Sequence, residues 1–182
     1  MPTTTAPTAA PIAETFVREN IIRAIGDVFQ TMLGYGVQPA AAAPPDSAVG
    51  SSSRPSVPAI PAPLVVGTVG FIGKLNGLIY LYFDESLALR CTGDMLCMGE
   101  LELAETGAES VNDAIGELTN MVVGSFKNCL CDAGYPCKLT IPSILRGSNF
   151  CVEPISHAQR HVYYFQCHGH QMVADIHLKS GE

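Results

Sequence analysis

The sequence has few charged residues, no cluster of basic ones and no long apolar run, and each absence excludes a class of function. Charged residues make up 15% of the 182 residues and the net charge is −7. No lysine- and arginine-rich surface is therefore available to neutralise nucleic-acid phosphates, and the acidic balance also argues against docking on anionic lipid. Hydrophobic residues make up 47%, which suits one well-packed globular domain.

Membrane and secretory signals are also missing. The first residues, MPTTTAPTAAP, lack the basic start and continuous apolar core of a signal peptide. No apolar run approaches the roughly 20 residues that span a bilayer. The seven cysteines are odd in number, irregularly spaced and without a Cys-x-x-Cys pair, a pattern typical of small core residues in a reducing compartment. We therefore expect a cytoplasmic protein.

Two low-complexity segments interrupt the chain. Residues 1–11 are a Thr/Ala/Pro tail, and residues 37–63 are rich in Ala, Pro and Ser. Neither segment can bury enough apolar surface to offset the entropy lost on ordering. We expect a disordered tail at 1–11 and a single domain over 12–179 that contains a mobile linker at 37–63.

The other segments show helical or strand patterns. Apolar residues recur at helical spacing over 12–33 and 108–132, and Asp84 is placed as the N-cap of a shorter helix at 85–97. Runs of β-branched and aromatic residues predict strands at 64–73, 78–83, 137–141, 150–153, 161–167 and 171–179. The order of these elements predicts an α+β fold in which two long helices pack on a largely antiparallel sheet.

Two short motifs predict hairpin turns within this sheet. Asn76-Gly77 is a strong turn signal between the first two strands. His168-Gly169-His170 is placed at the turn of the last hairpin. Both turns would join strands that are neighbours in an antiparallel sheet.

The helix expected at 108–132 carries a polar ridge opposite its apolar stripe. At about 100° per residue, Asp113, Glu117, Asn120 and Gly124 fall within about 60° of one another. The apolar stripe consists of Val111, Ile115, Leu118, Val122, Phe126 and Cys129. An exposed helix face is normally polar, so periodicity alone assigns the ridge no function. Asn and Gly are nevertheless poor mid-helix residues, and a glycine there leaves room for a partner's backbone.

The ridge resembles the signature of the CheC/CheX/FliY family of bacterial chemotaxis phosphatases. That signature is an Asp or Ser, a Glu four residues later, an Asn three residues further and a Pro somewhat over twenty residues beyond. Asp113, Glu117, Asn120 and Pro142 match it here. The flanking segments VFQTMLG, GFIGKLNGLIYLYFDES and SVNDAIGELTNMVVGSFKNCL resemble the family as well.

The sequence is similar to the single-site CheX type within that family. Glu109 and Asn112 also have the Glu-x-x-Asn spacing. However, Glu105 stands four residues before Glu109, where the signature has Asp or Ser, and no proline follows at the required distance. The first helix has no comparable motif. One site per chain is therefore expected, and the tail at 1–11 and the linker at 37–63 are additions to the family pattern.

The resemblance implies a CheX-like fold and a phosphatase that hydrolyses the aspartyl phosphate of a CheY-like response-regulator receiver domain, in chemotaxis or another two-component pathway. Asn120 would orient the attacking water and Glu117 would pair with the receiver's active-site lysine, while Asp113 and Gly124 would contact the partner. The receiver would supply Mg²⁺, so no metal site or cofactor belonging to this chain is expected. The resemblance also implies a homodimer with the sheets joined edge to edge.

Three other interpretations stay open. The first is a metal site among His157, His161, Cys167, His168, His170 and His177. The spacing of these residues matches no standard ligand set, which favours turn or surface histidines. The second is a non-catalytic binding module like the middle domain of the flagellar switch protein, although such a module need not retain the Glu-x-x-Asn pair. The third is a nucleophilic hydrolase, which the absence of Gly-x-Ser-x-Gly disfavours.

Overall fold

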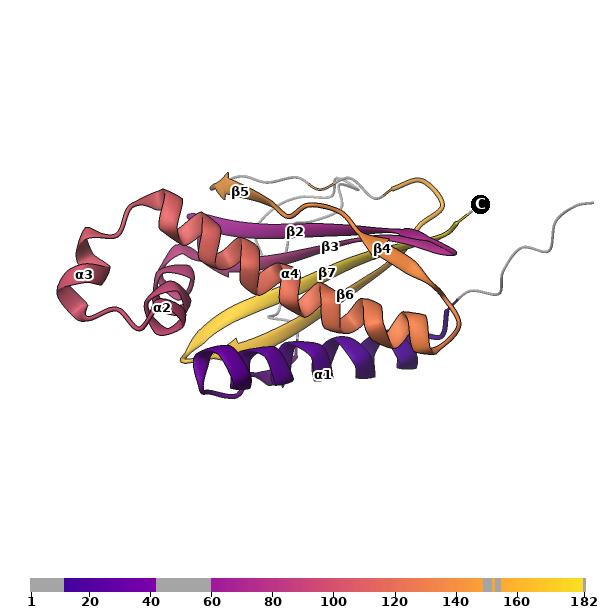
Figure 1. Cartoon of the computed structure of the whole chain (residues 1–182), viewed down its shortest axis with the longest axis horizontal. Helices are drawn as coiled ribbons and strands as arrows, with labels where there is room; N and C mark the ends of the chain where they lie inside the picture. Colours follow the sequence, from indigo (N-terminus) through magenta and orange to yellow (C-terminus); the bar gives the residue numbers. More distant parts are fainter. Residues whose placement is uncertain (1–11, 42–59, 149–151, 153–154, 182) are drawn as a thin grey trace, which may run out of the picture.

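The fold is an antiparallel sheet with two long helices on one face. The computed structural model describes residues 12–41, 60–148, 152 and 155–181. The elements are, in chain order, α1 (Glu14–Leu33), β1 (Gln38–Ala40), β2 (Leu64–Gly73), β3 (Leu75–Asp84), α2 (Glu85–Leu96), α3 (Glu100–Glu105), α4 (Ala108–Asp132), β4 (Cys137–Leu139), β5 (Ser143–Gly147), β6 (Gln159–Cys167) and β7 (His170–Ser180). Within these residues the sheet has seven strands in the order β1-β6-β7-β3-β2-β4, with β5 also pairing with β2. Figure 1 shows α1 and α4 side by side across this sheet, so the predicted α+β architecture is confirmed.

The apolar stripes of α1 and α4 form the core with the helix-facing side of the sheet. Both helices have the predicted extent, and α1 ends at Gly34, which has a positive φ of 79°. The predicted stripe of α4 is buried from Val111 to Phe126, while Cys129 is half-buried. Because both long helices bury an apolar stripe against one sheet face, their opposite sides are left to solvent.

A missing side chain on β2 lets α4 lie close to the sheet. Thr119 is fully buried, and its hydroxyl donates to the carbonyl of Ile115 at 2.6 Å. A Cβ at Gly67 would lie only 2.0 Å from Thr119 Oγ1. Position 67 therefore has no room for a side chain, and the middle of α4 is held against β2 next to the predicted ridge.

The helices α2 and α3 lie at one end of the molecule (Figure 1). The predicted N-cap is confirmed, because Asp84 Oδ1 accepts from the backbone N–H of Leu87 at 2.8 Å. The helix α3 is not in the sequence prediction. None of its residues is buried, so it lacks the apolar periodicity by which helices are recognised.

The prediction of a turn at Asn76-Gly77 is wrong. Both residues lie inside β3 and pair with β7, and the chain reverses at Lys74 instead. The side chain of Asn76 accepts from the backbone N–H of Gly73 at 3.0 Å. The asparagine thus closes the turn with its side chain while its backbone belongs to the strand. The turn at His168-Gly169 is confirmed, with φ values of 50° and 81°.

One edge of the sheet is built from β4 and β5, which pair with successive parts of β2. Phe71 pairs with Leu139 of β4, and Thr68 pairs with Ser143 of β5. Two residues of β2 therefore face three residues of the edge, which is the arrangement of a β-bulge. The backbone N–H of Thr140 donates to the carbonyl of Gly70 at 2.8 Å. Val69 is consequently opposed by both Ile141 and Pro142.

Other expectations fall partly outside the described residues. The tail at 1–11 and residues 42–59 of the linker lie outside them, as does most of the strand expected at 150–153. Gln38–Ala40, at the start of the expected linker, form β1 and pair with β6. The strand expected at 137–141 ends at Leu139 because the bulge follows, and β5 is not in the sequence prediction.

The second face of the sheet has a buried charged pair. Arg160 binds both carboxylate oxygens of Asp175, at 2.9 and 2.7 Å, and His177 Nε2 lies 3.1 Å from Asp175 Oδ1. Burial raises the pKa of Asp175, but the close contacts with His177 and Arg160 outweigh this effect and the pKa is lowered. No helix in the described part of the chain is long and apolar enough to cross a membrane.

Candidate functional site

The four ridge residues predicted from the sequence lie together on α4. Asp113 and Glu117 are exposed, and Asn120 and Gly124 are half-buried. The steps between them are four, three and four residues, which keeps them on one side of the helix. Among the described residues, no hydrogen bond or ion pair engages the side chains of Asp113, Glu117 or Asn120. Their polar atoms are therefore available to another molecule.

The other Glu-x-x-Asn pair on α4 is not available in this way. The side-chain oxygen of Asn112 accepts from Arg146 Nε at 2.6 Å. The same guanidinium donates to the carbonyl of Ala108 and lies 3.3 Å from Glu85 Oε1. Arg146 thus ties β5 to the first turn of α4, and Asn112 has a structural contact that Asn120 lacks.

The bulged edge of the sheet runs along the side of α4 that carries Asn120. A Cβ at Gly124 would meet Leu139 of β4 at 3.7 Å, and a Cβ at Gly116 would meet Ile144 of β5 at 3.9 Å. On the helix Asn120 lies midway between these two glycines, at about 40° from each. Since β4 is beside Gly124 and β5 beside Gly116, the bulge that joins them passes Asn120. The structure thereby brings Pro142, the last residue of the sequence signature, close to the ridge.

The glycine of the ridge has a neighbour within the chain. Gly124 was expected to keep the ridge low for a partner. A Cβ there would make only an ordinary van der Waals contact with Leu139, at 3.7 Å, so the packing of β4 on α4 does not itself require a glycine. Its role toward a partner remains a prediction.

The surface around the ridge is strongly acidic. Between residues 91 and 126 the chain has seven carboxylates and no lysine or arginine, whereas the rest of the chain has ten of each sign. This segment therefore accounts for the whole net charge of −7. The exposed members that lead along α3 and α4 to the ridge are Glu100, Glu102, Glu105, Glu109, Asp113 and Glu117. Arg146 of β5 contacts the first turn of α4, but most charges along α3 and α4 are negative, and such a surface attracts a partner with a basic surface.

The C-terminal histidines do not gather into one site. His170 Nδ1 lies 2.8 Å from Asp84 Oδ2, and the ring of His168 packs edge-on against Tyr35 with centroids 4.1 Å apart. His177 is buried on the second face of the sheet, beside Asp175. Within the described residues, no group of three or more His, Cys, Asp or Glu is arranged to hold a metal ion.

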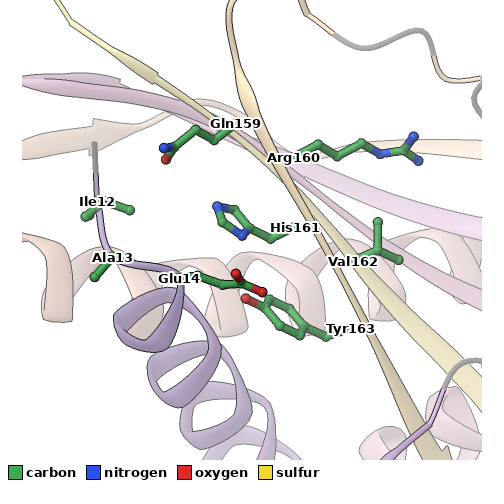
Figure 2. A pocket seen from close by; sticks show the side chains of 8 residues that line it. All are labelled: Ile12, Ala13, Glu14, Gln159, Arg160, His161, Val162 and Tyr163. Atoms are coloured by element: carbon green, nitrogen blue, oxygen red, sulfur yellow. The ribbon is translucent and has the colours of Figure 1, made fainter. Parts of the chain in front are cut away.

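A cavity of about 590 Å³ lies elsewhere, between the start of α1 and β6. Figure 2 shows His161 and Tyr163 projecting from β6 toward Glu14, and their rings are parallel with centroids 6.4 Å apart. Burial, reinforced by Glu14, raises the pKa of Tyr163 to about 12, and burial lowers that of His161. The residues that line the cavity come from the N-terminal end of α1 and from β6, so it is separate from the ridge on α4.

Sequence reasoning missed the parts that surround the ridge. Arg146 lies on β5, which was not predicted, and nothing in the sequence pairs this residue with Asn112. The bulge at Ile141 and Pro142 had one signal, the proline, which is tolerated in a sheet only at edges and bulges. Its position opposite Val69 depends on the register of two strand pairs, which the sequence does not show.

Solved structures with this fold include several chemotaxis proteins. CheX from Vibrio vulnificus matches with a TM-score of 0.70 and 22% identity, covering 92% of this chain and 97% of that one. CheX in a CheX–CheY–BeF₃–Mg²⁺ complex from Borrelia burgdorferi matches with a TM-score of 0.65 and 18% identity, covering 90% and 98%. The FliM middle domain from Vibrio alginolyticus matches with a TM-score of 0.53 and 11% identity, covering 91% and 92%. These identities establish the fold alone.

The family is established by the sequence. No curated protein matches the chain. The family described as chemotaxis phosphatase CheX matches residues 65–166, which is more than half of the chain and includes all of β2 except Leu64, and the whole of β3 and α4. The match contains Asp113, Glu117, Asn120 and Pro142, the four residues of the signature. The chain therefore belongs to the CheX family of chemotaxis phosphatases.

Proposed function

We propose that this chain hydrolyses the aspartyl phosphate of a CheY-like receiver domain through Asn120 and Glu117. The main support is that the side chains of both residues, on the ridge of α4, make no hydrogen bond or ion pair with any described residue. The nearby Asn112, by contrast, is bound by Arg146. The Borrelia burgdorferi relative was solved together with CheY, beryllium fluoride and magnesium, which supports a receiver as the partner.

The amide of Asn120 suits the positioning of a water molecule. An aspartyl phosphate is an activated acyl phosphate, and its hydrolysis passes through a loose transition state that needs little help from a base. The water oxygen bonds to phosphorus while the bond to the aspartyl oxygen breaks, and the proton is lost to the phosphate product or to solvent. The side-chain oxygen of Asn120 would accept a hydrogen bond from this water and hold it in line. Such positioning lowers a barrier by several kcal/mol.

Glu117 suits the anchoring of the partner. It lies three residues before Asn120 on the same side of the helix, and it is exposed. Its carboxylate would bind the ammonium group of a receiver lysine by a charge-assisted hydrogen bond. Magnesium would come with the receiver and neutralise charge on the phosphoryl oxygens. Asp113, one turn earlier, would lie at the edge of the contact.

The test uses receiver domains of the source organism, phosphorylated and then mixed with the purified chain. We expect faster loss of phosphate from one or more of them. Asn120→Ala should lower the acceleration about 100-fold or more, which is the loss typical of a misplaced reacting group. Gln30→Ala, which removes an exposed amide on α1, is the matched control and should act as the unaltered chain does. Full activity of Asn120→Ala would refute the assignment.

The FliM match supports one alternative, a non-catalytic platform for protein binding. A platform would bind a receiver without changing the lifetime of its phosphate. The same assay separates the two functions, because binding without acceleration by the unaltered chain would favour the platform. We place the phosphatase first because the Glu-x-x-Asn pair is present and both side chains are free of partners within the described structure.

We further propose that two chains associate edge to edge at β6. The strand β1 pairs only with residues 164–166 of β6, and no other described strand lies beside residues 159–163 on that side. An uncovered strand edge offers backbone groups for pairing with another chain. Sedimentation equilibrium should give twice the mass of the chain, and a monomer at high concentration would contradict the dimer.

We also propose that the protein is located in the cytoplasm, where it would encounter the proposed receiver. Cell fractionation can check this location.

A further inference from the structure

The β-bulge beside the ridge exposes an apolar side chain at the place where a partner would dock. Ile141 is 87% exposed, although isoleucine is among the residue types most often buried. Exposed apolar residues that occur singly are ordinary on protein surfaces. The position and the rigidity of Ile141 distinguish it from such residues.

The position follows from the register of the bulge. Side chains alternate between the two faces of a strand, so a single extra residue moves each later side chain to the opposite face of the sheet. Leu139 contacts the side of α4 before the bulge, and Ile144 contacts it after the bulge, five residues later rather than four or six. In an unbroken strand Ile141 would share the helix-facing side with Leu139. The bulge instead leaves it exposed to solvent, on the part of the sheet edge that passes the middle of α4.

The rigidity follows from the residues on either side. Thr140 is held by two hydrogen bonds to Gly70, from the backbone N–H of Thr140 to the Gly70 carbonyl at 2.8 Å and from the Gly70 N–H to Thr140 Oγ1 at 2.9 Å. A Cβ at Gly70 would lie 3.1 Å from that hydroxyl oxygen, so the glycine leaves room for this contact. Pro142 restricts the backbone of the residue before it to extended conformations. Ile141 is therefore fixed from both sides.

We propose that Ile141 is the apolar anchor for the phosphorylated receiver. It would insert into an apolar patch of the receiver beside the phosphorylated aspartate and so hold the receiver against the ridge. This proposal rests on the phosphatase function proposed above. We take the receiver as the partner that contacts Ile141, because the anchor is continuous with the ridge of Glu117 and Asn120. An apolar anchor beside the reacting group and charged residues farther out also reproduce the usual arrangement of a protein interface.

A preorganised anchor strengthens association without new charges. An ordered side chain loses little conformational entropy on binding, so more of its burial appears as affinity. Since Ile141 would not touch the water or the phosphoryl group, its removal should act on KM far more than on kcat. It is a positioning residue and not a catalytic one.

The experiment compares three variants of the full chain in steady-state dephosphorylation of the receiver that responds to the unaltered chain. Ile141→Ala should raise KM about tenfold, which corresponds to about 1.4 kcal/mol, and leave kcat within about twofold. Ile141→Leu keeps the apolar volume and should restore KM to near its original value. Ile72→Ala is the matched control, because Ile72 is 65% exposed and lies next to the buried Phe71 on β2, so it points to the opposite face of the sheet.

Each outcome bears on the anchor, on the phosphatase assignment or on both. All three variants should melt at the same temperature as the unaltered chain, since both isoleucines are exposed. A KM of Ile141→Ala equal to that of Ile72→Ala would overturn the anchor and leave the phosphatase assignment intact. Absence of acceleration by the unaltered chain with every receiver would overturn both. Loss of kcat at unchanged KM would also overturn the anchor, because that result would place Ile141 in the chemistry.

Discussion

The two long helices lie side by side on the same face of the sheet, yet they use their polar residues in opposite ways. On α1, Asn20 is buried, its amide donates to the carbonyl of Phe16 at 2.8 Å, and its oxygen accepts from Arg23. On α4, Asn120 is half-buried and engages no described residue. One asparagine is part of the structure, and the other is free for a partner.

The same contrast holds for the charges. The exposed side of α1 has both signs, and Arg23 of α1 also donates to Cys129 of α4 at 3.1 Å. The exposed side of α4 and the preceding α3 has carboxylates alone as far as Lys127. Whether the fold occupies a polar side chain depends on its tertiary contacts, and its residue type alone does not reveal this. The comparison can be tested by changing matched residues on the two helices.

A large kinetic difference is expected for the glutamates. Glu117→Ala should lower kcat/KM for receiver dephosphorylation about 30-fold or more, because removing one partner of a buried interfacial charge pair costs at least about 2 kcal/mol. Glu19→Ala on the exposed side of α1 should leave kcat/KM unchanged. Receiver kinetics with both variants provide the measurement. Equal activity of the two variants would remove the distinction between the helices.

The asparagines should give the next largest effect, on stability. Asn20→Ala removes a buried side chain that both donates and accepts, and should lower the free energy of unfolding by about 1–3 kcal/mol. Asn120→Ala should leave it within about 0.5 kcal/mol, since no internal contact is lost. Urea denaturation of both variants measures the difference. A stability loss in Asn120→Ala as large as in Asn20→Ala would show that Asn120 is structural.

A smaller effect is expected at the second Glu-x-x-Asn pair of α4. Asn112→Ala breaks the hydrogen bond with Arg146, which is partly exposed, and should destabilise the protein by about 1 kcal/mol. The acceleration of dephosphorylation per folded molecule should stay the same. A loss of activity at full stability would mean that Asn112 contributes to the site.

The smallest effect is expected at the edge of the acidic surface. Asp113→Asn should raise KM less than about threefold at low salt and weaken the dependence of KM on ionic strength, because an exposed charge acts mainly through long-range attraction. Asp27→Asn, an exposed carboxylate on α1, is the control and should change neither quantity. KM is to be measured at several salt concentrations. A salt dependence unchanged by Asp113→Asn would separate this residue from the docking surface.

Long elements were predicted well and short ones poorly, for a physical reason. A helix of 20 or 25 residues repeats its apolar stripe several times, so α1 and α4 were recognised at nearly their true ends. The three residues of β1, the six of α3 and the five of β5 give no such repetition. Their conformations depend on pairing or packing with distant segments. At Asn76-Gly77 the expected local turn gave way to pairing with β7.

The sequence by itself determined the α+β class and the two amphipathic helices, and its signature indicated Asp113, Glu117 and Asn120 as candidate site residues. These features depend on local periodicity and on residue identity at fixed spacing, both of which can be read along the chain. The tertiary structure decided which polar groups remain free. It occupies Asn112 with Arg146, places Thr119 against Gly67, and brings the bulge at Ile141 and Pro142 beside Asn120. Each of these contacts joins residues far apart in the chain, and strand register and close packing, which no local pattern specifies, bring them together.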